Sequence, residues 1–142
     1  MAYWIKIDYE RSKYLIDLDH ITAFSCQPNK RLTFWLPNSS QPIILNKQSC
    51  EHDYQLVIKY ITEKIEINCL TNDECWVHII YDRHEWFINL NCITTFASEP
   101  NGRITFWLPD STKDIIISPN IDPEAYEKVV EFITKVTGYS LP

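Results

Sequence analysis

Two histidines in this chain have acidic residues close by in the sequence, the arrangement from which an acid–base or metal site could be built. His20 follows Asp17 and Asp19, and His84 stands between two further acidic residues. A zinc or general acid–base site needs additional groups at set spacings, and neither neighbourhood supplies a third ligand or a helical spacing. We therefore expect no catalytic residue, no metal and no cofactor, and we interpret the protein as non-enzymatic.

Five cysteines, at positions 26, 50, 69, 75 and 92, are the other residues that could do chemistry. They include no C-x-x-C pair, which argues against a zinc site, and their odd number argues against a disulfide framework. We expect buried or incidental thiols.

Tryptophan and arginine form the strongest candidate for a binding surface. In the alternating segment 31–36, Arg31 and Trp35 share one strand face, and Arg103 with Trp107 repeats that pair further along. Each pair could stack on a ligand or approach a phosphate, although an arginine beside a tryptophan is commonly cation–π support. We take these four residues as binding candidates.

Trp4 and Trp76 extend this candidate surface, because each falls on the less apolar face of its strand. Four bared tryptophans would expose about 800 Å² at roughly 200 Å² each. Soluble monomers usually expose apolar patches of only a few hundred Å². Some of this surface should therefore be covered, by the rest of the chain, another copy or a partner, and alternation alone does not decide which tryptophans are buried.

The sequence consists of two tandem copies of one unit. A shift of 72 positions aligns Trp4–Ile65 with Trp76–Thr137 without a gap, and the match is densest where 28–37 meets 100–109. No cysteine or histidine position recurs in the second copy. Because two copies are too few for a solenoid, we interpret them as a pseudo-twofold pair.

Each copy is predicted to contain antiparallel strands followed by a helix. Segments 4–10 and 31–36 alternate apolar and polar residues, as half-buried strands do. The segment 14–26 should bend near Asp19-His20, and a count of four or five strands depends on that bend. In the second helix Asp122 can cap the free amides, and Gly138 should end the helix.

We predict an α+β fold of tandem duplicated ββββα units, with antiparallel sheets and one helix in each unit, forming a pseudo-twofold single domain. The predicted units are 1–66 and 76–142, joined by a linker at 67–75. Two separate domains of about 70 residues would each bury too little surface, so the units should share a core. A barrel of the pleckstrin-homology-like kind, with each copy as one half, is the alternative fold.

The net charge is −6, with a pI near 5.1, and the acidic excess lies entirely in residues 67–142. No apolar stretch approaches the roughly 20 residues that span a bilayer. The N-terminal residues lack the basic and apolar regions of a secretory signal. We expect a soluble, cytoplasmic protein with no membrane partner.

Our first functional hypothesis is an interaction, scaffold or regulatory protein that presents a duplicated sheet to a protein partner or associates with itself. The acidic charge disfavours nucleic acid, because neutralising phosphates supplies most non-specific affinity. A third hypothesis, after the alternative that follows, is a small ligand at the seam between the copies. Partner identity, pathway and oligomeric state are not encoded in any pattern that we can read.

The alternative is single-stranded nucleic acid binding. Two consecutive ββββα units are similar to the arrangement of Whirly and PUR-type binders, and the resemblance covers strand order along the whole chain without a shared motif. It implies sheet aromatics that stack on bases. A local strip of Lys6, Arg31, Trp4 and Trp35 could provide that contact despite the acidic background, because stacking contributes roughly 1 to 3 kcal/mol per base.

Overall fold

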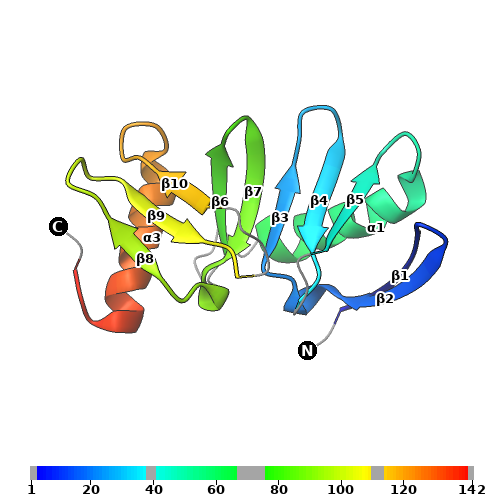
Figure 1. The fold of residues 1–142 in the computed structure, drawn as a ribbon, viewed down its shortest axis with the longest axis horizontal. Helices are drawn as coiled ribbons and strands as arrows, with labels where there is room; N and C mark the ends of the chain where they lie inside the picture. The colour runs from blue at the N-terminus through cyan, green and yellow to red at the C-terminus, as the bar shows by residue number, and fades with distance from the viewer. Residues whose placement is uncertain (1–2, 38–40, 67–75, 110–113, 141–142) are drawn as a thin grey trace.

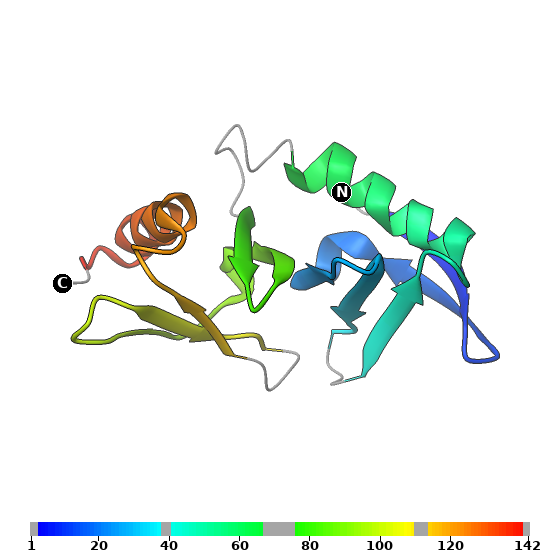
Figure 2. The same cartoon turned by 90° about the horizontal axis from the view of Figure 1, so that it is seen from above.

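The computed structural model describes residues 3–37, 41–66, 76–109 and 114–140. Within these ranges the chain is α+β with antiparallel sheets, as predicted. Figure 1 shows the strands side by side along the long axis, and Figure 2 shows both long helices on one side of the strands. The predicted linker 67–75 lies outside the described residues, and the domain boundaries stay a prediction.

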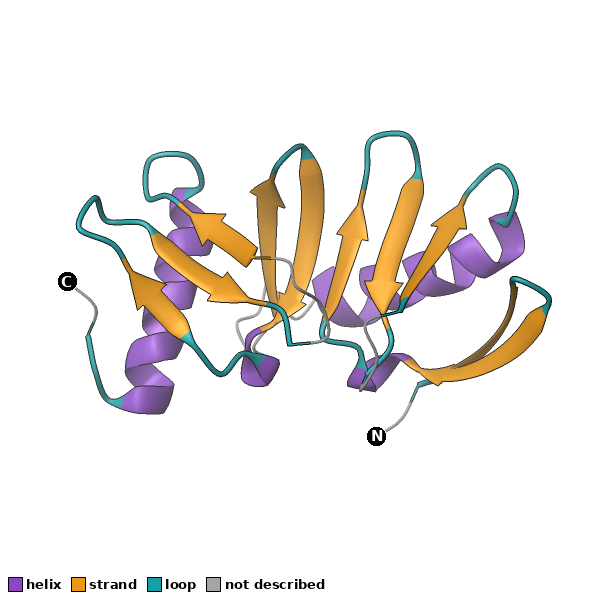
Figure 3. Cartoon of the chain, in the orientation of Figure 1, coloured by secondary structure: helices purple, strands orange, loops and turns teal. Residues whose placement is uncertain are grey.

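Both halves contain the same succession of elements, which Figure 3 colours by type. The first half holds β1 (Trp4–Tyr9), β2 (Ser12–Asp17), a 3₁₀ turn (Leu18–His20), β3 (Ala23–Cys26), β4 (Arg31–Trp35), β5 (Pro42–Asn46) and α1 (Glu51–Tyr60), which runs on as a π-helical segment (Ile61–Glu66). The second half holds β6 (Trp76–Tyr81), β7 (His84–Asn89), a 3₁₀ turn (Leu90–Cys92), β8 (Phe96–Ser98), β9 (Ile104–Trp107), β10 (Asp114–Ile117) and α3 (Pro123–Thr137).

Each half therefore has five strands in the described residues, and the predicted four-strand unit is wrong. The bend anticipated near Asp19 breaks the long segment in two. The Asp17 side chain accepts a hydrogen bond from the Asp19 amide at 3.1 Å, and the Ile21 amide donates to the Leu18 carbonyl at 3.1 Å. Such local bonds compete with strand pairing, so the backbone turns before β3 begins.

One antiparallel joint connects the two halves. The five-stranded sheet has the order β5-β4-β3-β7-β6, so β3 of the first half pairs with β7 of the second. The register places Ala23 opposite Ile88 and Cys26 opposite Glu85. Because β6 and β7 form a hairpin, the second half contributes its first two strands to the sheet of the first half.

The reciprocal joint is not formed between described residues. A pseudo-twofold arrangement would also pair β8 with β2, but β8 is an edge of the sheet β10-β9-β8 and β2 pairs only with β1. The strand pairing therefore does not reproduce the predicted twofold. The free edge of β2 and the free edge of β8 lie at opposite ends of the row in Figure 1.

The described residues form two hydrophobic cores, and the β6–β7 hairpin contributes side chains to both. Trp76 and Phe87 on one hairpin face pack into the first core with α1, whereas Val77 and Trp86 pack into the second core with α3. The β1–β2 hairpin contributes only one face, which includes Ile7, to a core. The predicted sharing of apolar packing between the halves therefore occurs through this hairpin and through Ala23 and Trp35 of the first half, which pack into the second core.

The helix signals in the sequence are confirmed at α3. Asp122 accepts a hydrogen bond from the Ala125 amide at 3.3 Å, and Pro123 occupies the first turn. Gly138 adopts φ 80°, the left-handed conformation that ends helices. The residue before α1, Cys50, makes no side-chain cap, which is the clearest local difference between the two helix starts.

Candidate functional site

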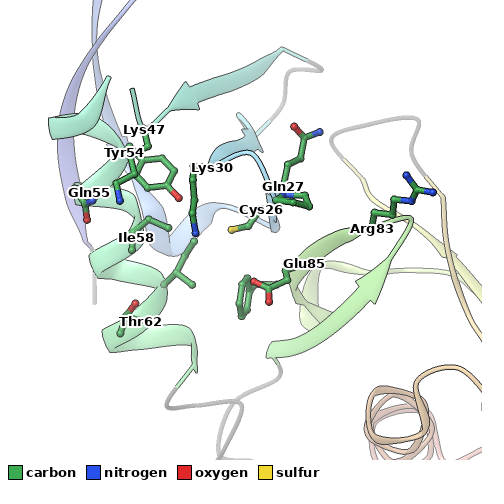
Figure 4. Close-up of a pocket in the computed structure, with 13 residues that line it drawn as sticks. Cys26, Gln27, Lys30, Lys47, Tyr54, Gln55, Ile58, Thr62, Arg83 and Glu85 are labelled. Carbon is green, nitrogen blue, oxygen red and sulfur yellow. The ribbon is translucent and has the colours of Figure 1, made fainter. Parts of the chain in front are cut away.

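A cleft of about 620 Å³ lies at the joint, between α1 and the paired strands β3 and β7. Figure 4 shows its side chains coming from three directions: the helix, the β3–β4 turn and the β7 strand. The lining residues are Cys26, Gln27, Pro28, Lys30, Lys47, Tyr54, Gln55, Ile58, Ile61, Thr62, Arg83, Glu85 and Phe87. We call this space the seam cleft.

Backbone geometry brings three cations to the seam cleft. Lys30 has a positive φ of 64° in the turn between β3 and β4, and the Lys47 amide donates to the Lys30 carbonyl at 3.1 Å. Arg83 has φ 65° in the tight turn between β6 and β7. In Figure 4 the Lys30 side chain extends into the space between α1 and β7. Against these three cations the cleft has one carboxylate, Glu85.

The floor of the seam cleft is apolar and includes a phenol. Phe87 and Ile61 are buried beneath it, and Tyr54 is buried except for its outer edge. Burial raises the pKa of the Tyr54 phenol above its ordinary 10.0, and the Cys26 thiol adds to this effect. Tyr54 therefore stays protonated near neutral pH and is a hydrogen-bond donor within a mainly cationic site.

One polar residue of the seam cleft, Gln27, is held by His84. Its two ring nitrogens lie 3.2 Å from the Ser25 hydroxyl and 3.1 Å from the Gln27 amide nitrogen. Because that amide nitrogen donates, the imidazole nitrogen beside it accepts, and the other nitrogen carries the proton toward Ser25. His84 therefore positions Gln27, and these two hydrogen bonds do not involve Asp82 or Glu85, the residues considered with it from the sequence.

The two lysines of the seam cleft come from the first unit, and Arg83 comes from the second. Shifted by 72 positions, Lys30 becomes Gly102 and Lys47 becomes Pro119. The two rim glutamines change to acids in the second unit, at Glu99 and Glu127. Two positive residues of the first unit are thus neutral in the second, and two neutral ones are negative, so the second unit is the more acidic at these equivalent positions.

The structure separates the six binding candidates named from the sequence, and none of them lines the seam cleft. Trp76 is 5% exposed and packs against Phe24, with ring centroids 6.1 Å apart. Trp35 is half-buried and stacks on Trp86 at 5.7 Å with an interplanar angle of 6°. The other half of the chain therefore covers both tryptophans.

The other four candidates face solvent. Trp4 is 64% exposed on the β1–β2 hairpin, and Trp107 is 45% exposed on β9. Arg31 and Arg103 are exposed at or just before the start of β4 and β9. The assignment of these residues to binding stays a prediction.

His20, the other histidine with acidic neighbours in the sequence, does contact one of them, Asp17. The Asp17 carboxylate lies 2.8 Å from His20 Nδ1 and accepts the Tyr3 amide at 2.9 Å. Desolvation raises the Asp17 pKa, but the amides of Tyr3 and Asp19 and the charge and hydrogen bond of His20 together outweigh it, so the pKa is lowered from 3.8. Asp17 is therefore ionised at neutral pH.

We expect Asp17→Asn to destabilise the protein at pH 7 but not under strongly acidic conditions. A carboxylate with a depressed folded pKa contributes stability above its unfolded pKa, near 3.8, and this is lost as the pH falls through the folded pKa. The second unit has Asn89 there, which accepts the Asn91 amide at 3.0 Å, so asparagine preserves the turn. Melting temperatures of both proteins from neutral to acidic pH should converge below pH 3.8. A pH-independent difference would contradict this account.

Within the described ranges, no group of three or more histidine, cysteine or acidic side chains is placed to hold a metal. Cys26, Cys50 and Cys92 are half-buried and are not in disulfides, whereas the cysteines at 69 and 75 lie outside the described residues. In the part of the chain that the structure describes, no helix has both the length and the apolarity needed to cross a bilayer.

The seam-cleft residues were missed in the sequence analysis. We searched for features shared by the two units, whereas Lys30, Lys47 and Gln55 are features that the units do not share. Subtracting one copy from the other, position by position, would have marked them as sites of charge change. Their convergence with Arg83 still required the β3–β7 pairing.

Neither a protein-family model nor a curated protein sequence matches this chain. Among solved structures it is similar to the LytTr DNA-binding domain of a Bacillus cereus protein described as a methyl-accepting/DNA response regulator. The TM-score is 0.47, the sequence identity is 9%, and the similarity covers 96% of this chain and 97% of that one. A similarity this distant does not allow the role of any residue in that domain to be assigned to a residue of this chain.

We correct the expectation of a platform for a protein partner and of a chain disfavoured for nucleic acid. The solved structure found by comparison is, by its name, a DNA-binding domain rather than a scaffold. Our charge argument also used the net charge of the whole chain, whereas the seam cleft is locally basic. A phosphate interacts mainly with charges within a Debye length of about 8 to 10 Å, so local charge is the relevant quantity.

Proposed function

We propose that this protein binds single-stranded nucleic acid and that the seam cleft holds its phosphates. One observation carries the proposal: Lys30, Lys47 and Arg83 line one cleft that has a single carboxylate, in a chain of net charge −6, with the Arg83 guanidinium pointing outward at the rim (Figure 4). Arginine and lysine are the usual phosphate ligands, and the protonated Tyr54 phenol supplies a neutral donor beside them.

The form of the cleft favours a single strand over a duplex. Its lining combines the cations with buried apolar residues, including Phe87 and Ile61, so it suits a ligand that has both an anionic and an apolar part. A single strand exposes unpaired bases next to its phosphates, whereas a duplex keeps its bases stacked inside. Gln27, Gln55 and Thr62 add the amide and hydroxyl groups that can contact a base edge or a sugar.

In this proposal the chain is a duplicated protein in which both units contribute to the phosphate-binding site. Each unit has two strands, then three strands, then a helix. The first unit supplies Lys30 and Lys47, and the second adds Arg83 but has acidic residues at the positions equivalent to the rim glutamines. The proposal retains the non-enzymatic role and the cytoplasmic location expected from the sequence.

Fluorescence anisotropy with labelled oligonucleotides of about 16 nucleotides, as a single strand and as a duplex, tests the proposal. We expect saturable binding, with the single strand preferred. If about three phosphates are neutralised, the slope of log affinity against log salt should be near −2, at about 0.7 per phosphate for single strands.

Two results would overturn the proposal. One is the absence of binding at low salt. The other is binding that inorganic phosphate displaces at the same concentration of phosphate groups, because the cleft would then recognise an isolated anion rather than a strand.

A further inference from the structure

The two hairpins differ in what covers one of their faces. In the β6–β7 hairpin, β3 pairs along the outer edge of β7, and Trp76 and Phe87 are buried. In the β1–β2 hairpin, no described strand pairs with the outer edge of β2. The residues equivalent to that buried pair are Trp4, 64% exposed, and Leu15, 70% exposed.

In the β6–β7 hairpin, the contacts of Trp76 show which kind of group can pack at the position that Trp4 occupies in the β1–β2 hairpin. Trp76 packs against the planar ring of Phe24, with centroids 6.1 Å apart and planes inclined by 34°. Phe24 reaches it from β3, the strand whose counterpart is missing beside β2. The equivalent place next to Trp4 is therefore suited to a planar ring that the described chain does not supply.

A second cleft, of about 330 Å³, lies at this edge. This volume is at the lower end of the range for ligand sites, as for a single ring system. Its lining residues are Trp4, Tyr14, Leu15, Ile16, Asp17, His20, Leu36 and Pro37. We call it the hairpin cleft; it combines apolar walls with one polar corner.

The polar corner is a histidine held by a buried carboxylate. The Asp17 side chain is 8% exposed and lies 2.8 Å from His20 Nδ1, whereas the His20 side chain is 74% exposed. Because the ionised carboxylate can only accept, Nδ1 carries the proton and Nε2 is left to contact a ligand. The second unit has Asn89 and Cys92 at these positions, so this corner exists in one unit only.

Basic residues lie on the same face of the hairpin. Lys6 is opposite Leu15 in the strand register, and Lys13 is opposite Asp8. Asp17, opposite Trp4, lies on the same face, so this face carries two lysines and two aspartates beside the hairpin cleft. These exposed lysines can approach the phosphates that flank a bound base.

We propose that the hairpin cleft binds one nucleobase, which stacks against Trp4 and presents its hydrogen-bonding edge to His20 Nε2. The inference rests on the proposed function, since the base belongs to the strand whose phosphates occupy the seam cleft. It adds a base-dependent contact to binding that is otherwise governed by phosphates.

Oligonucleotides with bases and abasic oligonucleotides of the same length test this assignment by anisotropy. The wild type should bind the base-containing strand more tightly, and Trp4→Ala should lower that affinity by between about fivefold and a hundredfold. Affinity for the abasic strand and the salt slope should not change, because the seam cleft is intact. His20→Ala should reduce the same difference. Tyr139→Ala, which removes an aromatic ring that is 77% exposed elsewhere, is the matched control.

The outcomes separate the two proposals. Preference for bases that Trp4→Ala leaves unchanged would overturn the nucleobase site while the phosphate site stands. Failure of the wild type to bind either strand would remove both. A wild-type protein that sediments as an oligomer, and becomes monomeric on Leu15→Lys, would also overturn the assignment, because a strand of another copy would then cover this edge.

Discussion

Changing Lys30 and Lys47 together to glutamate should weaken binding of a single strand by roughly tenfold or more at low salt. Each lysine that neutralises one phosphate contributes about 0.7 to the salt slope, so the slope should become shallower by about 1.4. Repulsion between the new carboxylates and the strand adds to the loss. Anisotropy titrations across a range of salt concentrations would measure both effects.

The control for this prediction makes the same change in net charge elsewhere. Lys59 on α1 and Lys135 on α3 are exposed and do not line the seam cleft. Their double change to glutamate should have a much smaller effect, because screening limits the reach of surface charge. Equal losses in the two double variants would show that binding responds to net charge alone and would contradict a phosphate site at the seam.

Phe24→Ala should cost about 3 to 5 kcal/mol in the free energy of unfolding, the usual range for removing a fully buried phenylalanine. Phe24 is fully buried, and its ring lies 5.6 Å from Phe34, 5.9 Å from Tyr60 and 6.1 Å from Trp76. The variant loses packing within the first core and across the β3–β7 joint. Urea unfolding followed by circular dichroism would measure the change.

The second unit supplies the matched comparison. Phe96 is equivalent to Phe24 and contacts Phe106 at 5.6 Å, but it is only half-buried because no described strand covers that side of β8. Phe96→Ala should therefore cost clearly less than Phe24→Ala. Equal costs would mean that Phe96 is as well covered as Phe24 and that the free edge of β8 is occupied in solution.

Much of the local structure could be predicted because its causes are local. Alternation identified β1 and β4, and the cap at Asp122 and the glycine at 138 gave the ends of α3. The strand count was the weakest local prediction, since the bend at Asp17–Asp19 depends on a side-chain hydrogen bond that competes with extension.

The candidate sites were less predictable, because their residues are brought together from distant segments. Ser25 and His84 are 59 positions apart, yet their side chains lie 3.2 Å from each other at the edge of the seam cleft. A scan of short motifs has no means to find such a pair. The search for shared features also passed over Lys30 and Lys47, which differ between the units.

The sequence by itself determined the internal repeat, the α+β class and the ends of α3, because each depends on neighbouring residues or on direct comparison of the two copies. Only the tertiary structure decided that β3 pairs with β7, while β2 and β8 each have an edge that no other described strand covers. Equivalent strands have nearly the same pattern, so nothing local distinguishes the pairing that forms from the one that does not. That choice buries Trp76, leaves Trp4 exposed and assembles the seam cleft, because burial depends on which strand lies alongside.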